Sequence, residues 1–466
     1  MFGARLFPGG IHPREGLNGK AENSGNPIQE LPAVSRVIIP LSQHIGAPAT
    51  ATVKKGDHVL MGQVIGEAAG FVSAPVHASV SGTVVEVGNC KLASGATVPA
   101  VTIDNDFQDE WVELHPSEHP ENLTAEEAQQ IIRNAGIVGM GGATFPTQVK
   151  LTPGAGKSIE KLIINGAECE PYLTADHRLM LEHTGEIVDG VRLLMLAFGV
   201  KEAVIGVEDN KKDAISALTD ACSGVEGLQV QALPVRYPQG GEKQLIYAIT
   251  KREVPVGGLP IDVGCVVLNV GTVFACDQAI RMGIPLVRRV TTVGGLVNNP
   301  GNFLVRIGTP VKALFEACGG TLPSCKQLIS GGPMMGISFK DTDCPVTKGT
   351  SGILALGKES IYPEETSCIR CARCLDACPM RLAPSRMDSY IRHERYDDAE
   401  KAGVMNCIEC GACTYVCPAK RLLTQSFRMG KKVINTRKKA AAAKAAAEAA
   451  QLAAEKAANE KEKKEA

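Results

Sequence analysis

The sequence predicts a multidomain α/β protein with four folded parts and a helical tail. Its 466 residues are far more than one domain usually holds. Strand-like and helix-like patterns alternate through the middle of the chain, and eight of the sixteen cysteines fall into two matching runs near its end. Hydrophobic residues at 44% and charged residues at 21% are enough for packed cores. A small disulfide-stapled module and a largely disordered chain are therefore excluded.

The charge balance and the apolar runs restrict the partners. Forty-nine Lys and Arg against fifty Asp and Glu leave a net charge of −1, so there is no basic excess for DNA or RNA, and we expect no nucleic-acid partner. No run approaches the roughly 18 apolar residues that a membrane-spanning helix needs. We therefore expect a cytoplasmic protein that is at most peripheral to a membrane.

The first part, residues 1–115, contains short predicted strands between about 36 and 104, interrupted by Gly and Pro. This stretch looks like the lipoyl/biotinyl-type barrel-sandwich fold. The carrier version of that fold needs a lysine at a hairpin tip, and Ala68–Phe71 has none, so we expect a docking or structural domain. Its histidines lack a tight ligand spacing, and we expect surface or turn positions for His12, His44, His58 and His77.

Residues 120–285 read as an α/β unit that opens with a helix and the loop GIVGMGGATFPT, followed by Lys150. Glycines at this density let backbone N–H groups approach a phosphate or a flat ring, although a tight turn explains the loop alone equally well. The apolar strand KLIINGAECEP then ends in polar side chains, at the strand end where open α/β sheets bind ligands. A helix at about 179–198, a strand at 203–207 and a helix at 211–218 continue the alternation. The turn YPQGGEKQ and a strand CVVLNVGTV, containing Asn269 and Thr272, complete the unit.

The two cysteine runs each follow C-x2-C-x2-C-x3-C-P, within residues 355–430. Three thiolates at this spacing can wrap one corner of a [4Fe–4S] cluster, and the fourth typically ligates the other cluster. Zinc is the alternative, but it leaves the third cysteine and the C-P ending without a role. The spacing predicts two clusters with crossed ligation: Cys368, Cys371, Cys374 and Cys417 on cluster 1, and Cys407, Cys410, Cys413 and Cys378 on cluster 2. The segment 379–406 reads as helical, which indicates an α-helical ferredoxin-type domain. We expect the eight scattered cysteines to be small buried hydrophobes.

Two further segments flank the cysteine-rich part. Residues 286–345 resemble the soluble-ligand-binding β-grasp domain, which acts either as a ligand site or as a spacer; we favour the spacer and expect Met334 and Met335 to pack. Residues 431–466 are rich in Ala, Lys and Glu, which favour helix but cannot build a core. We expect a solvated helix there, with a partner- or membrane-contacting tail as the alternative.

The motifs, taken in order, resemble a known family. GMGGATFPT, INGAECEPYLTADHRLM, RYPQGGEKQL, LNVGT and the twin cysteine runs look like the C subunit of the Rnf complex, a membrane-bound ferredoxin:NAD oxidoreductase, over about residues 5–425. They are also similar to the flavin- and NADH-binding subunit of respiratory complex I. The resemblance implies FMN surrounded by Gly139, Gly141, Gly142, Lys150, Asn165, Glu168, Tyr237, Gly240, Asn269 and Thr272. It also implies a nicotinamide nucleotide faced by Phe145, Glu170 and Glu242.

The resemblance implies an NAD(H)-reactive electron-transfer subunit at the cytoplasmic face of the cell membrane. Hydride exchange between NAD(H) and FMN would connect to single-electron relay through the two clusters, with Na+ or H+ movement in partner subunits. The implied partners are the other subunits of an Rnf-type complex, including a ferredoxin-linked one. Two alternatives stay open: a microcompartment-type cobalamin reductase, and a cluster-carrying docking subunit without a working nucleotide site.

Overall fold

The computed structural model describes residues 7–13, 19–361 and 363–465. The chain folds into two compact units. The first comprises Met1–Phe7 and Ile11–Tyr362, and the second comprises Pro8–Gly10 and Pro363–Ala466. The first unit holds every sheet of the described residues, and its three domains follow one another along the chain except that an N-terminal strand joins the sheet of the third domain. The protein is thus a multidomain α/β chain, as predicted.

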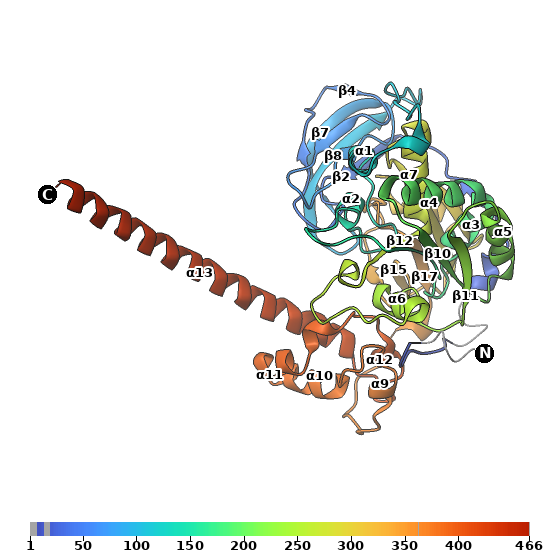
Figure 1. The fold of residues 1–466 in the computed structure, drawn as a ribbon. Coiled ribbons are helices and arrows are strands. Elements are labelled where there is room, and N and C mark those ends of the chain that lie inside the picture. The colour runs from blue at the N-terminus through green and yellow to red at the C-terminus, as the bar shows by residue number, and fades with distance from the viewer. Residues whose placement is uncertain (1–6, 14–18, 362, 466) are drawn as a thin grey trace. The chain divides into compact units, whose positions relative to one another are not determined.

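The N-terminal domain is a sandwich of two antiparallel sheets (Figure 1). One sheet contains β2 (Arg36–Pro40), β8 (Thr97–Asn105), β7 (Gly82–Lys91) and β4 (His58–Val59), in that order. The other contains β3 (Thr50–Ala51), β5 (Val64–Glu67) and β6 (Val76–His77).

One histidine of this domain differs from the prediction. His77 lies in strand β6 and is 4% exposed, so its predicted surface or turn position was wrong. His44 lies in a bend after β2, where it is buried at 8% exposed. The Nε2 atom of His44 accepts a hydrogen bond from the Ala74 N–H (3.1 Å), which replaces water for the buried ring. For His77, burial lowers the pKa to about 3, so the ring is neutral.

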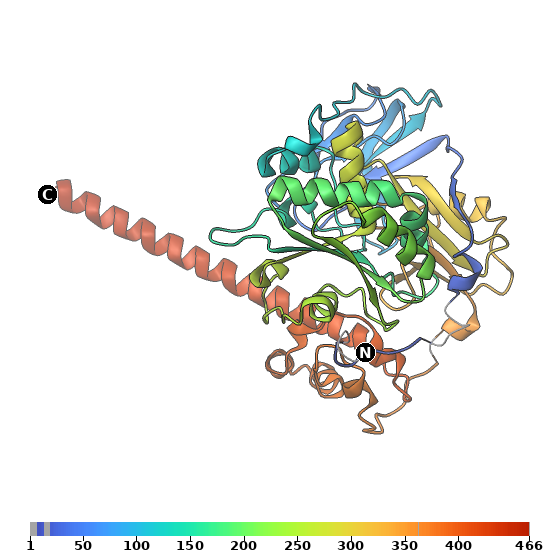
Figure 2. The ribbon, with the colours of Figure 1, turned by 45° about the vertical axis from the view of Figure 1, so that its right-hand side comes forward.

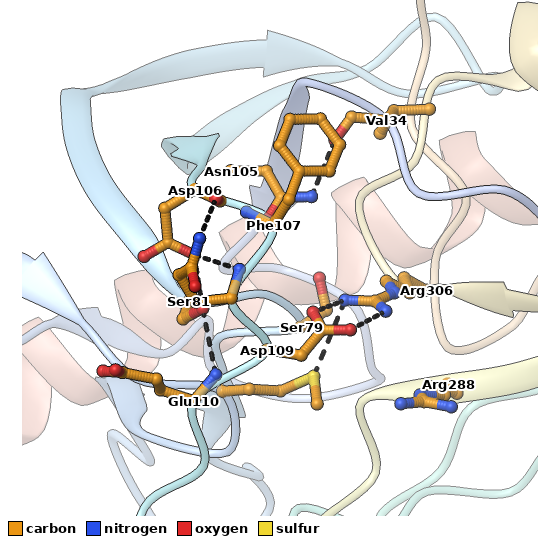
Figure 3. A network of polar contacts seen from close by, with 12 residues as sticks. Val34, Ser79, Ser81, Asn105, Asp106, Phe107, Asp109, Glu110, Arg288 and Arg306 are labelled. Atoms are coloured by element: carbon orange, nitrogen blue, oxygen red, sulfur yellow. Dashed lines mark hydrogen bonds and ion pairs between the residues drawn. The ribbon is translucent and has the colours of Figure 1, made fainter.

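A turn after β8 attaches the barrel to the third domain, and Figure 3 shows its polar contacts. The guanidinium of Arg306 donates to both carboxylate oxygens of Asp109, at 2.5 and 2.7 Å. Hydrogen bonding to Arg306 holds the pKa of Asp109 below its usual value. Ser81 of the barrel, just before β7, holds the same turn: its Oγ donates to Asp106 Oδ1 (2.6 Å) and accepts from the Glu110 N–H (3.2 Å). Charge-assisted hydrogen bonds therefore fix where the chain leaves the barrel.

The second domain is built on a four-stranded sheet in which every strand pair is parallel. Its order is β11 (Leu228–Leu233), β10 (Glu202–Glu208), β9 (Lys161–Gly166) and β12 (Cys265–Asn269). Helix α4 (Thr184–Phe198) lies on one face and helix α6 (Glu242–Thr250) on the other (Figure 1). Alternate residues of β9 follow this division, since Leu162 and Ile164 join the core under α4, whereas Ile163 joins the core under α6. Both faces are buried, as expected for a parallel sheet.

The helices of this domain refine two expectations. The helices are α1 (Ala125–Asn134), α2 (Thr147–Lys150), α3 (Ala175–Glu182), α4 (Thr184–Phe198), α5 (Lys212–Cys222), α6 (Glu242–Thr250) and α7 (Val270–Met282). The single helix expected at 179–198 is two helices that meet at His183. The strand expected to contain Thr272 ends at Asn269, because the Asn269 side chain caps helix α7 by accepting from the Gly271 N–H (2.9 Å), and Thr272 lies in the first turn of that helix.

The third domain is a six-stranded mixed sheet. Its order is β1 (Ile28–Glu30), β14 (Gly301–Arg306), β13 (Arg288–Gly295), β17 (Gly352–Leu356), β15 (Gln327–Ser330) and β16 (Ile337–Phe339). Helix α8 (Val311–Ala317) packs on it through Leu314 and Phe315. The segment Ile28–Glu30 joins the sheet although it precedes the barrel in sequence.

Lys348 joins all three domains of the first unit. Its side chain is 1% exposed, and its Nζ atom donates to the carbonyls of Pro75 in the barrel (2.8 Å) and Gly136 at the start of the glycine-rich loop (2.7 Å). Burial lowers the pKa of Lys348 from 10.5 to about 7. The glycine-rich loop is therefore held from behind by a lysine more than 200 residues away in the sequence.

The second unit is a helical domain with a long C-terminal helix. Its helices are α9 (Arg373–Asp376), α10 (Pro384–Arg392), α11 (Tyr396–Lys401), α12 (Ala412–Tyr415) and α13 (Leu423–Glu465). Helices α10 and α11 occupy the segment predicted as helical, and α13 continues as one rod through the Ala-rich tail (Figure 2). Met387, Ile391 and Phe427 form its core. The extreme N-terminal segment belongs here too, because the Gly10 N–H donates to the Ala377 carbonyl (3.0 Å).

Candidate functional site

The predicted site residues of the second domain gather at the carboxyl ends of β9 and β12. These two parallel strands are neighbours, with Asn165 opposite Asn269 in the register. The glycine-rich loop approaches the same edge, because the Met140 N–H donates to Thr272 Oγ1 (2.9 Å). Open α/β sheets bind ligands at this edge. The sequence motifs, spread over more than a hundred residues, thus meet in one place.

The glycine-rich loop is a compact turn with an open outer surface. The Gly139 N–H donates to the Phe145 carbonyl (2.8 Å), and the Thr144 N–H donates to the Gly139 carbonyl (3.1 Å). Gly142 adopts φ +104°, which favours glycine, and a side chain there would meet no atom within 4 Å. A Cβ on Gly141 would lie 3.5 Å from Asn269 Cβ. The loop therefore presents bare backbone to solvent while its inner side packs on the end of β12.

Asn165 and Asn269 fix the backbone around this edge. The Nδ2 atom of Asn165 donates to the Gly240 carbonyl (2.9 Å), and its Oδ1 accepts from the Ala167 N–H (3.1 Å). The Nδ2 atom of Asn269 donates to Asp176 Oδ2 (2.7 Å). Both amides thus use their donor and acceptor to join separate loops.

The turn that contains Tyr237 and Gly240 is held from several sides. Tyr237 is 2% exposed and pairs through its backbone with Ile11, at 2.8 and 2.9 Å. The Gly240 N–H donates to the Cys169 thiol (3.3 Å). Between these two residues, Gln239 is fully buried, and neither polar atom of its side chain has a hydrogen-bond partner among the described residues. A buried amide without partners is rare in folded proteins, and it fits a site that a polar ligand completes.

The carboxylates of the INGAECEP motif point to different partners. Glu168, at φ +45°, accepts from the N–H groups of Asp176 (2.7 Å) and His177 (3.2 Å) at the start of α3. Glu170 accepts instead from the N–H groups of Met334 (3.0 Å) and Met335 (2.9 Å) in the third domain. Burial raises the pKa of Glu170 to about 7.

Lys150 and Glu242, for which the family resemblance implies different ligands, form an ion pair. Lys150 Nζ lies 2.6 Å from Glu242 Oε1 and also donates to the Val267 carbonyl (3.2 Å). Both side chains are partly exposed, at 28% and 38%. They therefore remain accessible to a ligand that reaches this side of the strand ends.

Three charged residues near the strand ends were not identified from the sequence: half-buried Lys20 and the buried pair Lys211 and Glu208. Lys20 Nζ donates to the carbonyls of Glu168 (2.8 Å) and Leu173, and burial lowers its pKa. Lys211 Nζ donates to the Ala167 carbonyl (2.8 Å) and lies 3.2 Å from Glu208 Oε2. These lysines support the 167–173 loop from behind. No local sequence pattern identifies these lysines, because their partners are backbone carbonyls. Every residue carries such a group, and the partners are distant in sequence.

Asp176 adds a second perturbed carboxyl group at this edge. Burial, and then the nearby charge of Glu168, raise the pKa of Asp176 to about 7. Its hydrogen bond from Asn269 acts in the opposite direction. Carboxyl groups with such pKa values in a ligand-binding edge are typical of functional sites.

FMN fits the residues present at this edge. The bare backbone of the glycine-rich loop suits a flat ring or a phosphate, Lys150 supplies a positive charge, and the orphaned Gln239 amide needs polar partners.

In the second unit, cysteines of the two runs lie close to one another. Burial first, and neighbouring thiols second, raise the pKa of Cys410 to about 12, and Cys378 is among those neighbours. Cys378 also acts on the pKa of Cys407 and Cys413, where burial is again the main cause. For Cys374, burial raises the pKa and Cys417 adds to that effect. A fourth cysteine from one run thus approaches the other run in both directions.

Cys378, Cys407, Cys410 and Cys413 line one cavity. Met387, Leu382 and Phe427 supply its apolar wall. Among the residues that the structure describes, no group of three or more His, Cys, Asp or Glu converges tightly enough for a single metal ion. Four thiols on the wall of one cavity are the ligand type and number that a [4Fe–4S] cluster takes.

The two cysteine groups differ in exposure. Cys410 and Cys413 are buried, whereas Cys368 and Cys371 are exposed, and the intervening Ile369 is 67% exposed. Of the eight scattered cysteines, five are buried as expected and three are half-buried: Cys90, Cys169 and Cys325.

Within the described residues, no helix combines the length and apolarity that crossing a membrane requires.

Four family models match the chain. They are the RnfC barrel sandwich hybrid domain (residues 5–108), the Nuo51 FMN-binding domain (132–278), the SLBB domain (290–338) and the 4Fe-4S dicluster domain (360–418).

Curated relatives match over nearly the whole chain. The C subunit of the proton-translocating ferredoxin:NAD(+) oxidoreductase complex of Clostridium ljungdahlii is 47% identical, covering 91% of this chain and 93% of that protein. The C subunit of the Na(+)-translocating ferredoxin:NAD(+) oxidoreductase complex of Acetobacterium woodii is 47% identical, covering 92% and 97%. The C subunit of the ion-translocating oxidoreductase complex of Rhodobacter capsulatus is 42% identical, covering 92% and 83%. Among solved structures, an NAD+-reducing [NiFe]-hydrogenase chain matches with a TM-score of 0.48 and 18% identity, covering 67% of this chain and 65% of that chain.

Proposed function

This chain belongs to the family of C subunits of ion-translocating ferredoxin:NAD(+) oxidoreductase complexes, and from that premise we propose that it is their NAD(H)-reactive electron-transfer subunit. FMN, when bound, supplies the conversion between the two electrons of a hydride and the single electrons that clusters carry. The protein's task is to hold and orient the cofactors. The observation that carries the proposal is the convergence of the predicted FMN residues at the carboxyl ends of β9 and β12.

The FMN site is proposed to lie over the glycine-rich loop. Gly139, Gly141 and Gly142 allow close approach of the isoalloxazine or the phosphate, since no side chains intervene. Thr272 and Asn269 hold the loop and the end of β12 in register beneath it. Asn165, Glu168, Tyr237, Gly240 and Lys150 are proposed to border the same site.

The nicotinamide nucleotide is proposed to bind beside this loop, in contact with Phe145, Glu170 and Glu242. Carboxylates suit ribose hydroxyl and amide groups, and Phe145 can stack on a ring. Glu242 would exchange its partner Lys150 for the nucleotide or hold both together.

Single electrons are proposed to pass through two crossed [4Fe–4S] clusters. Cluster 1 would be held by Cys368, Cys371, Cys374 and Cys417, and cluster 2 by Cys407, Cys410, Cys413 and Cys378. The proximity of Cys378 to the second run and of Cys417 to Cys374 supports this pairing.

Iron content of two paired double variants tests the crossed ligation. Crossed ligation puts Cys378 and Cys410 on one cluster, so C378A/C410A should retain about four iron atoms per chain. The matched variant C378A/C371A removes a ligand from each cluster and should lose both. The reverse pattern would establish ligation within each run and overturn the crossed scheme.

We also propose a peripheral position at the cytoplasmic face of the cell membrane, with partner subunits that move Na+ or H+ and a partner that is linked to ferredoxin. Release from membranes by high salt without detergent, with loss of the partner subunits, would agree with this position. Resistance to extraction except by detergent would contradict it.

An anaerobic absorbance titration tests the proposed function. Purified protein with reconstituted clusters and FMN receives NADH, while flavin absorbance near 450 nm and cluster bleaching are followed together. We expect flavin bleaching followed by cluster bleaching. Clusters that respond to dithionite but not to NADH would refute the nucleotide site and leave a docking subunit that carries clusters.

A further inference from the structure

The Glu170 carboxylate lies in a turn of the third domain rather than at the open loop surface of the second. Its Oε2 and Oε1 atoms accept the consecutive N–H groups of Met334 (3.0 Å) and Met335 (2.9 Å). Glu170 follows β9, whereas the turn joins β15 to β16. One oxygen is engaged with each N–H group. The carboxylate is therefore turned towards the third domain.

The turn is shaped to receive this carboxylate. A Cβ on Gly332 would lie 2.3 Å from Glu170 Oε2 and 2.5 Å from Glu170 Cδ, so only glycine allows the approach. The Gly336 N–H donates to the Gly332 carbonyl (2.8 Å), and Gly331 adopts φ +91°. These features hold two N–H groups side by side, an arrangement that favours an anionic oxygen pair.

The surroundings of Glu170 act on its carboxylate in opposite directions. Burial raises its pKa, while the two N–H groups, Lys20 and the Tyr237 side chain act in the opposite direction. The thiol of Cys169 is the neighbouring titratable group, and Glu170 contributes to raising its pKa. The effect of burial on the pKa exceeds that of the favourable contacts. The ionised carboxylate would therefore have a lower free energy beside a partner that leaves it better solvated.

We propose that Glu170 is shared between the third-domain turn and the nicotinamide nucleotide, so that nucleotide binding withdraws the carboxylate and releases the turn 332–335. The proposal rests on the proposed function, because it requires a nucleotide site beside Glu170. It makes the third domain a structural reporter of nucleotide occupancy rather than a spacer. Both N–H bonds compete with the nucleotide for the same two oxygens.

The substitution Gly332→Ala should separate the Glu170 carboxylate from the turn 332–335 without changing Glu170 itself. The new Cβ prevents the contact, and the backbone of Gly332 is outside the left-handed region, so alanine brings no backbone strain. With the competing bonds removed, the Kd for NADH should fall about three- to tenfold, as expected for two hydrogen bonds of modest net worth. Glu170→Gln, which removes the charge that the nucleotide would use, should raise the Kd. Gly224→Ala, where a Cβ meets no atom within 4 Å, is the control and should leave the Kd unchanged.

Amide hydrogen exchange provides a readout independent of activity. In the wild-type protein without nucleotide, the N–H groups of Met334 and Met335 should be protected, and saturating NADH should accelerate their exchange about tenfold or more. G332A should show the fast exchange even without NADH. Unchanged protection on NADH binding, or a Kd that rises in both G332A and E170Q, would overturn the proposal, because the turn would then position Glu170 for the nucleotide. Failure of the wild-type protein to bind NADH at all would refute the proposed function instead. In that case, fast exchange of the Met334 and Met335 N–H groups in E170Q would still establish their contact with Glu170.

Discussion

Replacing Lys348 with Met should make the stability of the protein respond differently to pH. In the unfolded chain a lysine keeps its proton up to about 10.5, whereas burial lowers the pKa of Lys348 in the folded state to about 7. Between these values the unfolded chain binds one more proton than the folded one, so the free energy of unfolding rises with pH. The rise from this one group approaches about 1.4 kcal/mol per pH unit.

The Met variant lacks this contribution and carries two other changes. It avoids the cost of burying a charge, roughly 5 kcal/mol below pH 7 from the size of the pKa shift. It also leaves the carbonyls of Pro75 and Gly136 without their donor, at about 1–3 kcal/mol each. These effects nearly cancel at acidic pH. The variant should therefore match the wild type near pH 6 and fall increasingly behind it by pH 9.

Urea denaturation followed by fluorescence measures this difference. Trp111 is the only tryptophan of the chain, and it pairs with Met61 of the barrel, the domain whose Pro75 carbonyl Lys348 contacts. Exposed Lys54, changed to Met, is the matched control and should give a constant difference from the wild type. A K348M difference that stays constant from pH 6 to 9 would show that Lys348 titrates like an ordinary lysine and would refute the reasoning.

Three further substitutions have expected outcomes. Asp109→Ala leaves the guanidinium of Arg306, which is 8% exposed, without its carboxylate, and should lower the free energy of unfolding by about 1–3 kcal/mol in the same urea assay. Thr272→Val removes the acceptor of the Met140 N–H, and quenching of FMN fluorescence should show about tenfold weaker FMN binding; unchanged affinity would separate this contact from the flavin site. Asp277→Asn removes a carboxyl group whose pKa is raised to about 7, chiefly by burial. Because the folded protein keeps that proton between pH 4 and 7 while the unfolded chain loses it, the wild type loses stability over this range, and the variant should gain on it by about 2 kcal/mol from pH 5 to 8. Thermal unfolding at the two pH values checks the sign.

The sequence predicted the features that depend on the spacing of neighbouring residues. The C-x2-C-x2-C-x3-C-P runs restrict their cysteines to one kind of arrangement, so the approach of Cys378 to the second run could be anticipated. The apolar run KLIING could only be a buried strand with its polar groups at the end. In both cases the information lies within a few neighbouring residues.

The sequence did not predict the contacts between residues that lie far apart along the chain. Lys20 and Lys348 act on carbonyl groups, which every residue carries, so no pattern identifies their partners. Glu170 was expected to face the nucleotide, and its contact with the Met334 and Met335 N–H groups depends on how two domains pack. The strand expected through Thr272 was wrong because one helix-capping side chain, Asn269, outweighed the β-branched character of the segment.

The path of the first residues limits how this protein can be divided or recombined. Phe7 and Ile11 belong to the first unit, whereas the three residues between them belong to the second, whose other residues begin at 363. The two units therefore do not follow one another as separate segments of the chain, since a gene fragment that ends at residue 362 still encodes three residues of the cysteine-rich unit. Exchange of that unit between relatives would have to move two separate stretches of coding sequence together.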